Sequence, residues 1–348
     1  MIRKNTIGRA SLIAAFAFCV QTSFAQDVHF TQFNAAPLTI NPAFTGNFSG
    51  QWRASGIYRD QWRGVGGFQT YAMSFDAPIV NDLSHDDYLA AGVQLYNDRA
   101  GDANLSNISA LASIAYHKFL GGGSEDPNKA LSVGFQGGYT QKSIDLTKLY
   151  FQDEFNNQDF QQGTSGEYPN LNNKVNYFTV NAGISWAHSV GSRFSYVLGV
   201  GANNLNQPQE SFKRKRNADA GLGMRYTGQV GAKAFLSDRF SLRPAVLYQQ
   251  QASATEIVAG NEFHYILGNP EYSSFTSAVF VGGWVRPGDA FMATAGLEFK
   301  GFRIGFSYDR VSSDLKNATS GGFEIALTYL APDPLDFARR LVYPCSRF

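Results

Sequence analysis

Apolar and polar residues alternate along much of the chain. In residues 222–234, Leu222 and Met224 share one face of an extended segment, while Arg225 and Gln229 share the other. A period of two residues is typical of a β-strand, because successive side chains of a strand point to opposite faces. The same alternation recurs in residues 240–249, 291–300, 302–309 and 323–329. The sequence therefore predicts many strands with one apolar and one polar face.

Extended along the chain, this pattern predicts fourteen strands. They are expected over residues 51–60, 67–76, 87–97, 104–118, 129–142, 175–188, 193–203, 220–235, 239–251, 254–267, 275–286, 289–300, 301–311 and 318–330. Many of these segments are much longer than the roughly 5–6 residues usual for strands of globular proteins. A transmembrane barrel strand needs about 9–11 residues, with lipid on one face and the lumen on the other. We therefore expect an all-β transmembrane antiparallel barrel over residues 51–330. The alternative is a soluble β-sandwich or a pair of them.

The predicted connections separate the two ends of this barrel. With a periplasmic N-terminus, the short connections 189–192, 236–238 and 300–301 all fall on the periplasmic side, and the long connections 143–174 and 204–219 fall on the outer side. Outer-membrane barrels show this asymmetry between turns and loops. Connections 77–86 and 119–128 are long for periplasmic turns, and 287–288 is short for an outer loop. The even strand count predicts an outer-membrane protein with both termini in the periplasm.

Composition agrees with the alternation. Charged residues make up 16% of the chain, against about 25% in a typical soluble protein, yet the mean hydropathy is only −0.22. Sorting the residues by strand face explains this, because the charges are missing chiefly from one face. Aromatic residues gather near strand ends, as the interfacial girdles of barrels do; examples are Trp52, Tyr58, Tyr177, Trp186, Tyr248 and Tyr308.

Residues 1–25 have the pattern of a secretory signal peptide. Arg3, Lys4 and Arg9 precede an apolar run that ends at Val20, and Ala25 closes a short stretch suited to cleavage. The run is too short to span a bilayer. Without this leader the chain is nearly neutral, which gives no case for nucleic-acid binding. Cys345 is then the only cysteine, so neither an intrachain disulfide nor a multi-cysteine metal site is expected.

Candidate chemistry is sparse. The five histidines show no metal-binding spacing, and the glycine-rich points near Gly199 and Gly221 lack the dinucleotide fingerprint. In a strand such glycines relieve curvature or let a luminal segment approach closely. Ser113 and His117 share one strand face, as a hydrolase pair would, but the nucleophile-elbow motif is absent. We expect a protein that is not an enzyme and has no cofactor and no bound metal.

Charges of both signs are predicted to face the lumen. They are Arg53, Arg59, Asp76, Arg225, Lys233, Arg243, Glu298, Lys300, Arg303, Asp309 and Glu324. They line a solute channel or pair across a filled interior, and because buried charges need partners, the mixture of signs fits a filled lumen better. The basic run Lys213–Arg216 falls on a predicted outer loop. It is a solvated loop, or it contacts an acidic partner or lipopolysaccharide.

The two ends of the mature chain are not strands. Residues 26–50 do not alternate and contain several aromatic residues and prolines, which predicts a packed, irregular segment at the barrel mouth. Residues 331–348 form a predicted periplasmic tail after the last strand, and this tail offers aromatic and basic side chains to a partner.

Both ends carry a recognisable signature. The run Asp27–Gly46, followed by Tyr58–Trp62 and Ser74–Pro78, resembles the N-terminal signature of the PorP/SprF family. Residues Gly322–Tyr329 and the closing Pro344–Phe348 are similar to that family's final strand and terminus. The family usually has a cysteine followed directly by Pro-Arg-Phe, whereas here Ser346 intervenes and Pro344 precedes Cys345.

The resemblance implies an outer-membrane barrel of the type IX secretion system of Bacteroidota. Such proteins support the export or surface attachment of particular secreted proteins, for example gliding adhesins, and they link to periplasmic type IX or gliding machinery. The implied partners are a secreted protein with a type IX C-terminal sorting region, that machinery and outer-membrane lipid. The alternative is a porin-like diffusion channel for small solutes. Candidates for family-specific structure or docking are Phe30, Phe33, Pro42, Phe44, Tyr58, Arg59, Trp62, Arg340, Arg347 and Phe348.

Overall fold

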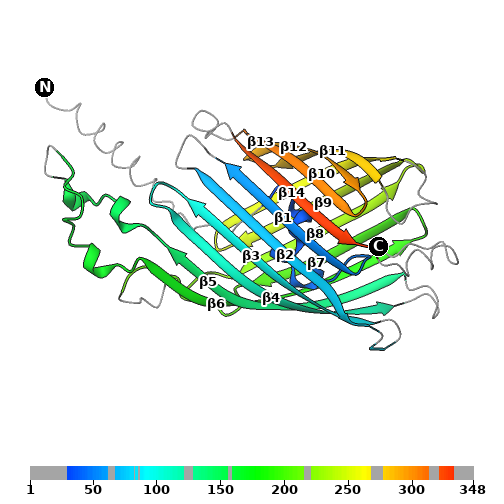
Figure 1. Cartoon of the computed structure of the whole chain (residues 1–348), viewed down its shortest axis with the longest axis horizontal. Coiled ribbons are helices and arrows are strands. Elements are labelled where there is room, and N and C mark those ends of the chain that lie inside the picture. The colour runs from blue at the N-terminus through cyan, green and yellow to red at the C-terminus, as the bar shows by residue number, and fades with distance from the viewer. Residues whose placement is uncertain are drawn as a thin grey trace, which may run out of the picture.

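Fourteen antiparallel strands close into a barrel in which β1 pairs with β14 (Figure 1). The computed structural model describes residues 30–61, 67–81, 83–84, 87–120, 128–155, 159–214, 221–267, 277–312 and 321–332. The strands are β1 (Trp52–Gln61), β2 (Phe68–Val80), β3 (Tyr88–Ala100), β4 (Leu105–Leu120), β5 (Lys129–Ser143), β6 (Lys174–Val190), β7 (Phe194–Asn203), β8 (Arg225–Phe235), β9 (Phe240–Gln251), β10 (Ala254–Leu267), β11 (Ser277–Arg286), β12 (Ala290–Phe299), β13 (Phe302–Val311) and β14 (Gly322–Ala331).

All fourteen predicted strands are present, and most of their bounds differ from the predicted bounds by only a few residues. β8 begins five residues later than predicted, because the residues before it pair with a loop instead of a neighbouring strand. Gly221 bridges to Gln209, and the Leu222 amide donates to the Pro208 carbonyl. Lys300 is the one luminal assignment that is plainly wrong. It lies exposed in the two-residue turn between β12 and β13, where both Lys300 and Gly301 have a positive φ.

The barrel has two distinct ends. At the end where β1 begins and β14 finishes, here called the terminal end, the turns β6–β7, β8–β9 and β12–β13 are short. The opposite end, here called the loop end, carries the two longest connections, residues 144–173 and 204–224. The first of these, the β5–β6 loop, contains the 3-10 turns η4 (Leu146–Lys148), η5 (Gln152–Glu154) and η6 (Tyr168–Asn170) and projects well beyond the strands (Figure 1).

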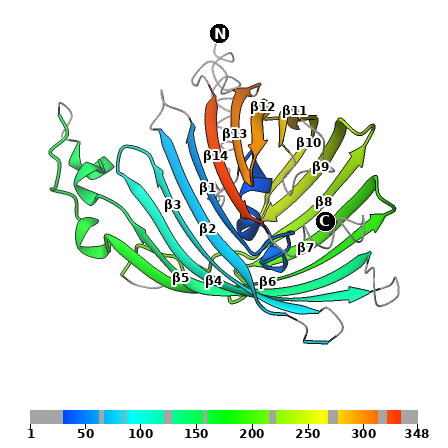
Figure 2. The same cartoon turned by 45° about the vertical axis from the view of Figure 1, so that its right-hand side comes forward.

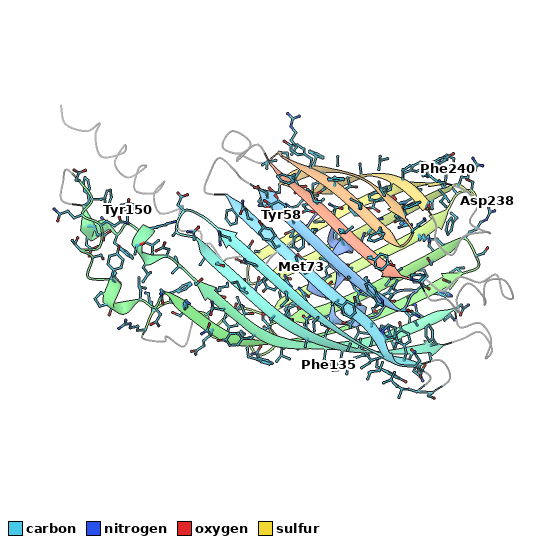
Figure 3. All side chains as sticks on the ribbon, viewed as in Figure 1. Tyr58, Met73, Phe135, Tyr150, Asp238 and Phe240 are labelled. Carbon is cyan, nitrogen blue, oxygen red and sulfur yellow. The ribbon has the colours of Figure 1, made fainter. Side chains whose placement is uncertain are left out.

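The outer face of the barrel is strongly apolar. Met73 is 63% exposed and Phe135 is 57% exposed, and both project from the outside of the sheet (Figure 3). Large aliphatic and aromatic residues are exposed in the same way on β2 to β14. Such a continuous apolar surface suits the hydrocarbon of a bilayer, so this is a transmembrane barrel. Among the described residues, no helix is both long enough and apolar enough to span a membrane.

Residues 30–50 lie inside the barrel, and this segment is here called the plug (Figure 2). It contains three 3-10 turns, η1 (Phe33–Ala35), η2 (Pro37–Thr39) and η3 (Pro42–Phe44). Prolines at the start of η2 and η3 prevent ladder pairing, since proline has no backbone N–H to donate. The segment is irregular and packed, as predicted, but it runs through the lumen instead of stopping at the mouth.

The direction of the plug sets where the described chain begins. Thr31 contacts Asp309 and Glu324 near the loop ends of β13 and β14, whereas Gly46 contacts Asp76 near the terminal end of β2. The plug therefore crosses from the loop-end half of the lumen to the terminal end before β1 starts. The first described residue and the end of β14 consequently lie in opposite halves of the barrel. Both ends of the chain lie outside the described residues, so their placement in the periplasm stays a prediction.

Candidate functional site

The candidate site is the lumen together with the plug that fills it. At the loop-end half, the plug backbone is held by acidic side chains of the wall. The Thr31 and Gln32 amides donate to the two carboxylate oxygens of Glu324, at 2.7 and 2.9 Å. The Thr31 hydroxyl donates to Asp309 at 2.9 Å. Arg59 of β1 neutralises both acids, lying 3.2 Å from Asp309 and 3.6 Å from Glu324. We call Arg59, Asp309, Glu324 and Thr31 the loop-side anchor.

A second anchor holds the other end of the plug. Arg53 of β1 forms a bidentate ion pair with Asp76 of β2, with N–O distances of 3.0 and 2.7 Å. Asp76 also accepts from the Gly46 amide at 2.6 Å, and Arg53 donates to the Phe44 carbonyl at 3.0 Å. Because Arg53 and Asp76 are paired neighbours across the sheet, the wall presents a preformed ion pair to this turn of the plug.

Ser113 and His117 contact the plug and do not contact each other as a catalytic pair would. The Ser113 hydroxyl lies 2.8 Å from the Thr45 hydroxyl. The His117 ring bonds on one side to the Thr45 carbonyl and on the other to Ser132, both at 2.7 Å. With both ring nitrogens engaged in this way, His117 is not placed to accept a proton from Ser113. The geometry assigns these two residues to plug docking.

The middle of the plug lies directly on glycines of the wall. The Asn41 side chain caps η3 through the Ala43 amide and donates to the carbonyls of Ile184 and Val200 on β6 and β7. A Cβ atom at Gly183 would overlap the Asn41 amide oxygen, and one at Gly134 would overlap the backbone of Pro42 and Ala43. Close approach of a luminal segment is one predicted role of strand glycines, and Gly134 and Gly183 have that role.

Two apolar clusters complete the contact between plug and wall. Phe33 packs edge-on against Trp284 of β11, with ring centroids 5.4 Å apart. This pair belongs to a buried cluster that also includes Ile40 and residues of β9 to β12. Phe30 packs with Ile57, Ala72 and Ala326 in a second cluster. Burying a Phe side chain contributes about 1.5–3 kcal/mol, so these contacts add substantially to the charged anchors.

Another group of charges lies in the wall at the terminal end. Arg303 bridges Glu262 at 2.8 Å and Glu298 at 2.6 Å, and Arg243 pairs with Glu298 at 2.8 Å. His264 lies 3.0 Å from Glu262. Arg243, Glu298 and Arg303 were predicted to face the lumen, whereas Glu262 and His264 were not, because β10 alternates poorly. Most of the mixed luminal charges therefore pair with one another, as predicted for a filled lumen, whereas Arg225 donates to the Thr39 carbonyl of the plug.

The predicted site residues fall into three groups. Phe30, Phe33, Pro42 and Arg59 are buried between plug and wall, and Phe44 is half-buried in η3, where its carbonyl accepts from Arg53. Tyr58 is on the outer face, where its ring packs against Tyr71 and edge-on against Phe323 and its hydroxyl donates to Asp60 (Figure 3). Outside the described residues lie Trp62, Arg340, Arg347 and Phe348. No group of acidic, histidine or cysteine side chains suited to a metal ion occurs in the part of the chain that the structure describes.

Outside the membrane, the β5–β6 loop is folded around one buried carboxylate. Glu154 accepts from the amides of Phe151 and Gly163, at 2.8 and 2.7 Å. Although burial raises the pKa of Glu154, these amide donors bring that pKa below its usual value. The carboxylate therefore stabilises the loop at neutral pH, and this contribution is lost only as the pH falls through the lowered pKa. The β5–β6 loop therefore has a defined structure at the loop end, fixed by the Glu154 carboxylate.

Comparison with known proteins identifies one family. The family described as Type IX secretion system membrane protein PorP/SprF matches residues 22–329. None of the curated proteins matches the sequence significantly. The solved Ralstonia pickettii toluene transporter TbuX is 10% identical, with 86% of this chain and 93% of that chain covered and a TM-score of 0.48. The deltaS2 mutant of the TodX monoaromatic hydrocarbon channel is 12% identical over 86% and 94% of the chains, with a TM-score of 0.49. Neither similarity bears on function.

Proposed function

Since the chain belongs to the PorP/SprF family of type IX secretion system membrane proteins, we propose that it is a non-enzymatic, plugged outer-membrane barrel that binds one specific secreted protein. Binding supports the export of that protein or its attachment at the cell surface. The observation that carries the proposal is the plug, which is joined to the wall at both anchors and through Asn41 between them. A lumen filled in this way favours binding at the barrel's outer surfaces over the passage of solutes.

The loop end offers the surface for this partner. The two longest loops are joined by backbone hydrogen bonds, from the Asn172 amide to the Phe212 carbonyl and from the Arg214 amide to the Asn170 carbonyl. On the β5–β6 loop, an aromatic cluster of Tyr150, Phe155 and Phe160 is exposed; Tyr150, 62% exposed, projects far from the strands (Figure 3). Exposed aromatic side chains commonly anchor protein interfaces.

The proposed partner is a secreted, gliding-adhesin-like protein that carries a type IX C-terminal sorting region. The loop end is assigned to the cell surface, because long loops of outer-membrane barrels lie on the outer side. The terminal end and the tail of residues 331–348 then face the periplasm and its type IX or gliding machinery. In the same scheme residues 1–25 are a leader that is removed before the plug docks.

Partner capture tests the loop surface. Affinity purification of the barrel from its native membrane is expected to recover one large secreted protein. The triple variant Tyr150→Ala, Phe155→Ala, Phe160→Ala is expected to reduce that recovery at least about tenfold, because truncating an anchor residue typically costs 1 kcal/mol or more. The matched control removes three exposed aromatic residues at the terminal end, Phe194, Phe240 and Phe302. Repeated recovery of the barrel alone, or equal loss in both variants, would count against the proposal.

The rival function is a diffusion channel for small solutes. A polar cavity remains beside the plug, lined by Gln94, Gln136, Asn181 and Arg225 among others. A solute pathway there would require the plug to move aside. The rival therefore predicts currents that depend on movement of the plug. In the partner-binding barrel the plug stays docked on the wall, so no current is expected whether or not the plug is locked in place.

A disulfide lock separates the two functions. The Thr45 and Ser113 hydroxyl oxygens lie 2.8 Å apart, so cysteines at both positions bring their sulfur atoms within bonding reach in a Cys345→Ser background. We expect the reduced and oxidised barrels alike to show no stable single-channel current in planar bilayers. Large currents from the reduced protein that disappear on oxidation would establish the solute channel instead.

A further inference from the structure

Four outward-facing residues form a straight row across β3 to β6 at the loop end. The strand register places Arg99 opposite Ser106, Ser106 opposite Ser143, and Ser143 opposite Lys174. Adjacent strands lie about 4.8 Å apart, so the two cations are separated by about 14 Å with hydroxyl groups between them. None of the four faces the lumen, because the inward positions of these strands are occupied by residues such as Gln94 and Gln136.

A groove of about 880 Å³ lies above this row. Its roof is the β5–β6 loop, which is fixed by hydrogen bonds from the Ile144 amide to the Asn173 carbonyl and from the Asp145 amide to the Ala103 carbonyl. Arg214 reaches the groove from the other long loop and adds a third cation to its lining. The remaining lining is rich in hydrogen-bond donors from Asn, Ser, Thr and Tyr side chains.

The cationic side chains of the groove are not neutralised by ion pairs within the described part of the chain. Arg99, Lys174 and Arg214 form no ion pair with any other residue in the described part of the chain. Asp145 is the one carboxylate in the lining, and it accepts from the Thr147 amide and hydroxyl. Three cations around a donor-rich groove suit a phosphate group, whose anionic oxygens are strong hydrogen-bond acceptors.

Apolar surface continues directly below the groove. The next outward-facing row, two residues further from the loop end, is Asn97, Ile108, Gln141 and Asn176. Beyond it, Leu95, Ala110, Tyr139 and Phe178 form an exposed apolar row that faces the bilayer. Cations, then polar groups, then aromatic and aliphatic groups are the order of layers at a membrane interface.

We propose that this groove binds the phosphate group of a membrane lipid in the loop-end leaflet, with the lipid's acyl chains lying along β3 to β6. The basic groove alone would suit any phosphate, and the apolar rows beneath it select an amphiphile. This site lies outside the lumen and does not depend on the plug or on the secreted partner.

The test is native mass spectrometry of the detergent-solubilised full barrel with phosphatidic acid as the probe. Diacylglycerol supplies the same tails without phosphate, and inorganic phosphate supplies the anion without tails. We expect phosphatidic acid to bind at least tenfold more tightly than either. Replacing Arg99, Lys174 and Arg214 by Gln is expected to weaken binding by roughly a hundredfold, because each interfacial cation contributes about fivefold. The matched control replaces three exposed cations outside the groove, Arg239, Lys300 and Arg310.

Equal binding of diacylglycerol or of the triple variant overturns the proposal, and equally tight binding of inorganic phosphate shows a free-anion site instead. Folding is verified by circular dichroism and by the heat-dependent gel mobility of a closed barrel. If the triple variant does not fold, Lys174→Glu alone is measured. That reversal is expected to weaken phosphatidic acid binding more than Lys174→Gln does, and equal affinities for the two would contradict the site.

Discussion

Replacing Arg59 by alanine is expected to destabilise the barrel by about 3–5 kcal/mol. Arg59 is only 3% exposed, and it is the cation that neutralises Asp309 and Glu324 in the loop-side anchor. Its removal leaves the two carboxylates buried beside each other without the cation that contacts them both, and burial limits their solvation by water. The Glu324 oxygens also hold the Thr31 and Gln32 amides, so protonation or movement of this carboxylate loosens the plug.

Urea unfolding in phospholipid vesicles, followed by tryptophan fluorescence, measures this effect. The matched control is Arg193→Ala, whose ion pair with Asp238 is also 3.2 Å long but has side chains that are 65% and 87% exposed. An exposed pair contributes at most about 1 kcal/mol. The combined variant Arg59→Met, Asp309→Asn, Glu324→Gln removes all the charges of the anchor and is expected to recover much of the lost stability. Equal losses for Arg59→Ala and Arg193→Ala would refute the role of the anchor.

Replacing Gly134 by valine is expected to displace the plug. The new Cβ atom would overlap the backbone of Pro42 and Ala43, which cannot rotate away as a flexible side chain would. Overpacking typically costs about 1–3 kcal/mol. Here the wall is a continuous hydrogen-bonded sheet, so the plug is the part that yields.

Thiol labelling reports the position of the plug. Ala43 is fully buried, so a cysteine at Ala43 in a Cys345→Ser background is expected to resist a water-soluble maleimide in the parent protein and to react in the Gly134→Val variant. The matched control is Gly283→Val on β11, where nothing lies within 4 Å of the added Cβ. Protection of the thiol in both variants, with unchanged stability, would show that the plug does not rest on Gly134.

Much of the barrel can be predicted from the chain, while little of the candidate site can. The strands are readable because the bilayer imposes the same requirement on every one, an apolar outer face at alternate positions. Arg53, Asp76, Asp309 and Glu324 were recognisable as luminal by the same parity. Their partners were not recognisable, since parity gives the face of a residue without the neighbours it meets.

His117 and Gly134 illustrate the difference. In sequence, His117 resembles half of a hydrolase pair, and Gly134 is one of 35 glycines. In the structure, the His117 ring donates to the Thr45 carbonyl, and the lack of a Cβ atom at Gly134 leaves space for the Pro42 backbone. The signal that pointed toward these roles was the irregular, aromatic and proline-rich segment before the first strand, which needed a packed environment. Its direction through the lumen had no local signal at all.

The sequence by itself determined a fourteen-stranded transmembrane barrel, the two long loops on one side and a lumen of mixed charges. Each of these follows from a local rule, namely period-two alternation, connection length or the parity of a charged residue. Only the tertiary structure decided that the lumen is plugged, which charges pair and where three loop-end cations meet. The Thr31 amide and its acceptor Glu324 are 293 positions apart. Such contacts exist only once the sheet has closed, because barrel closure and stagger determine which wall positions face the plug.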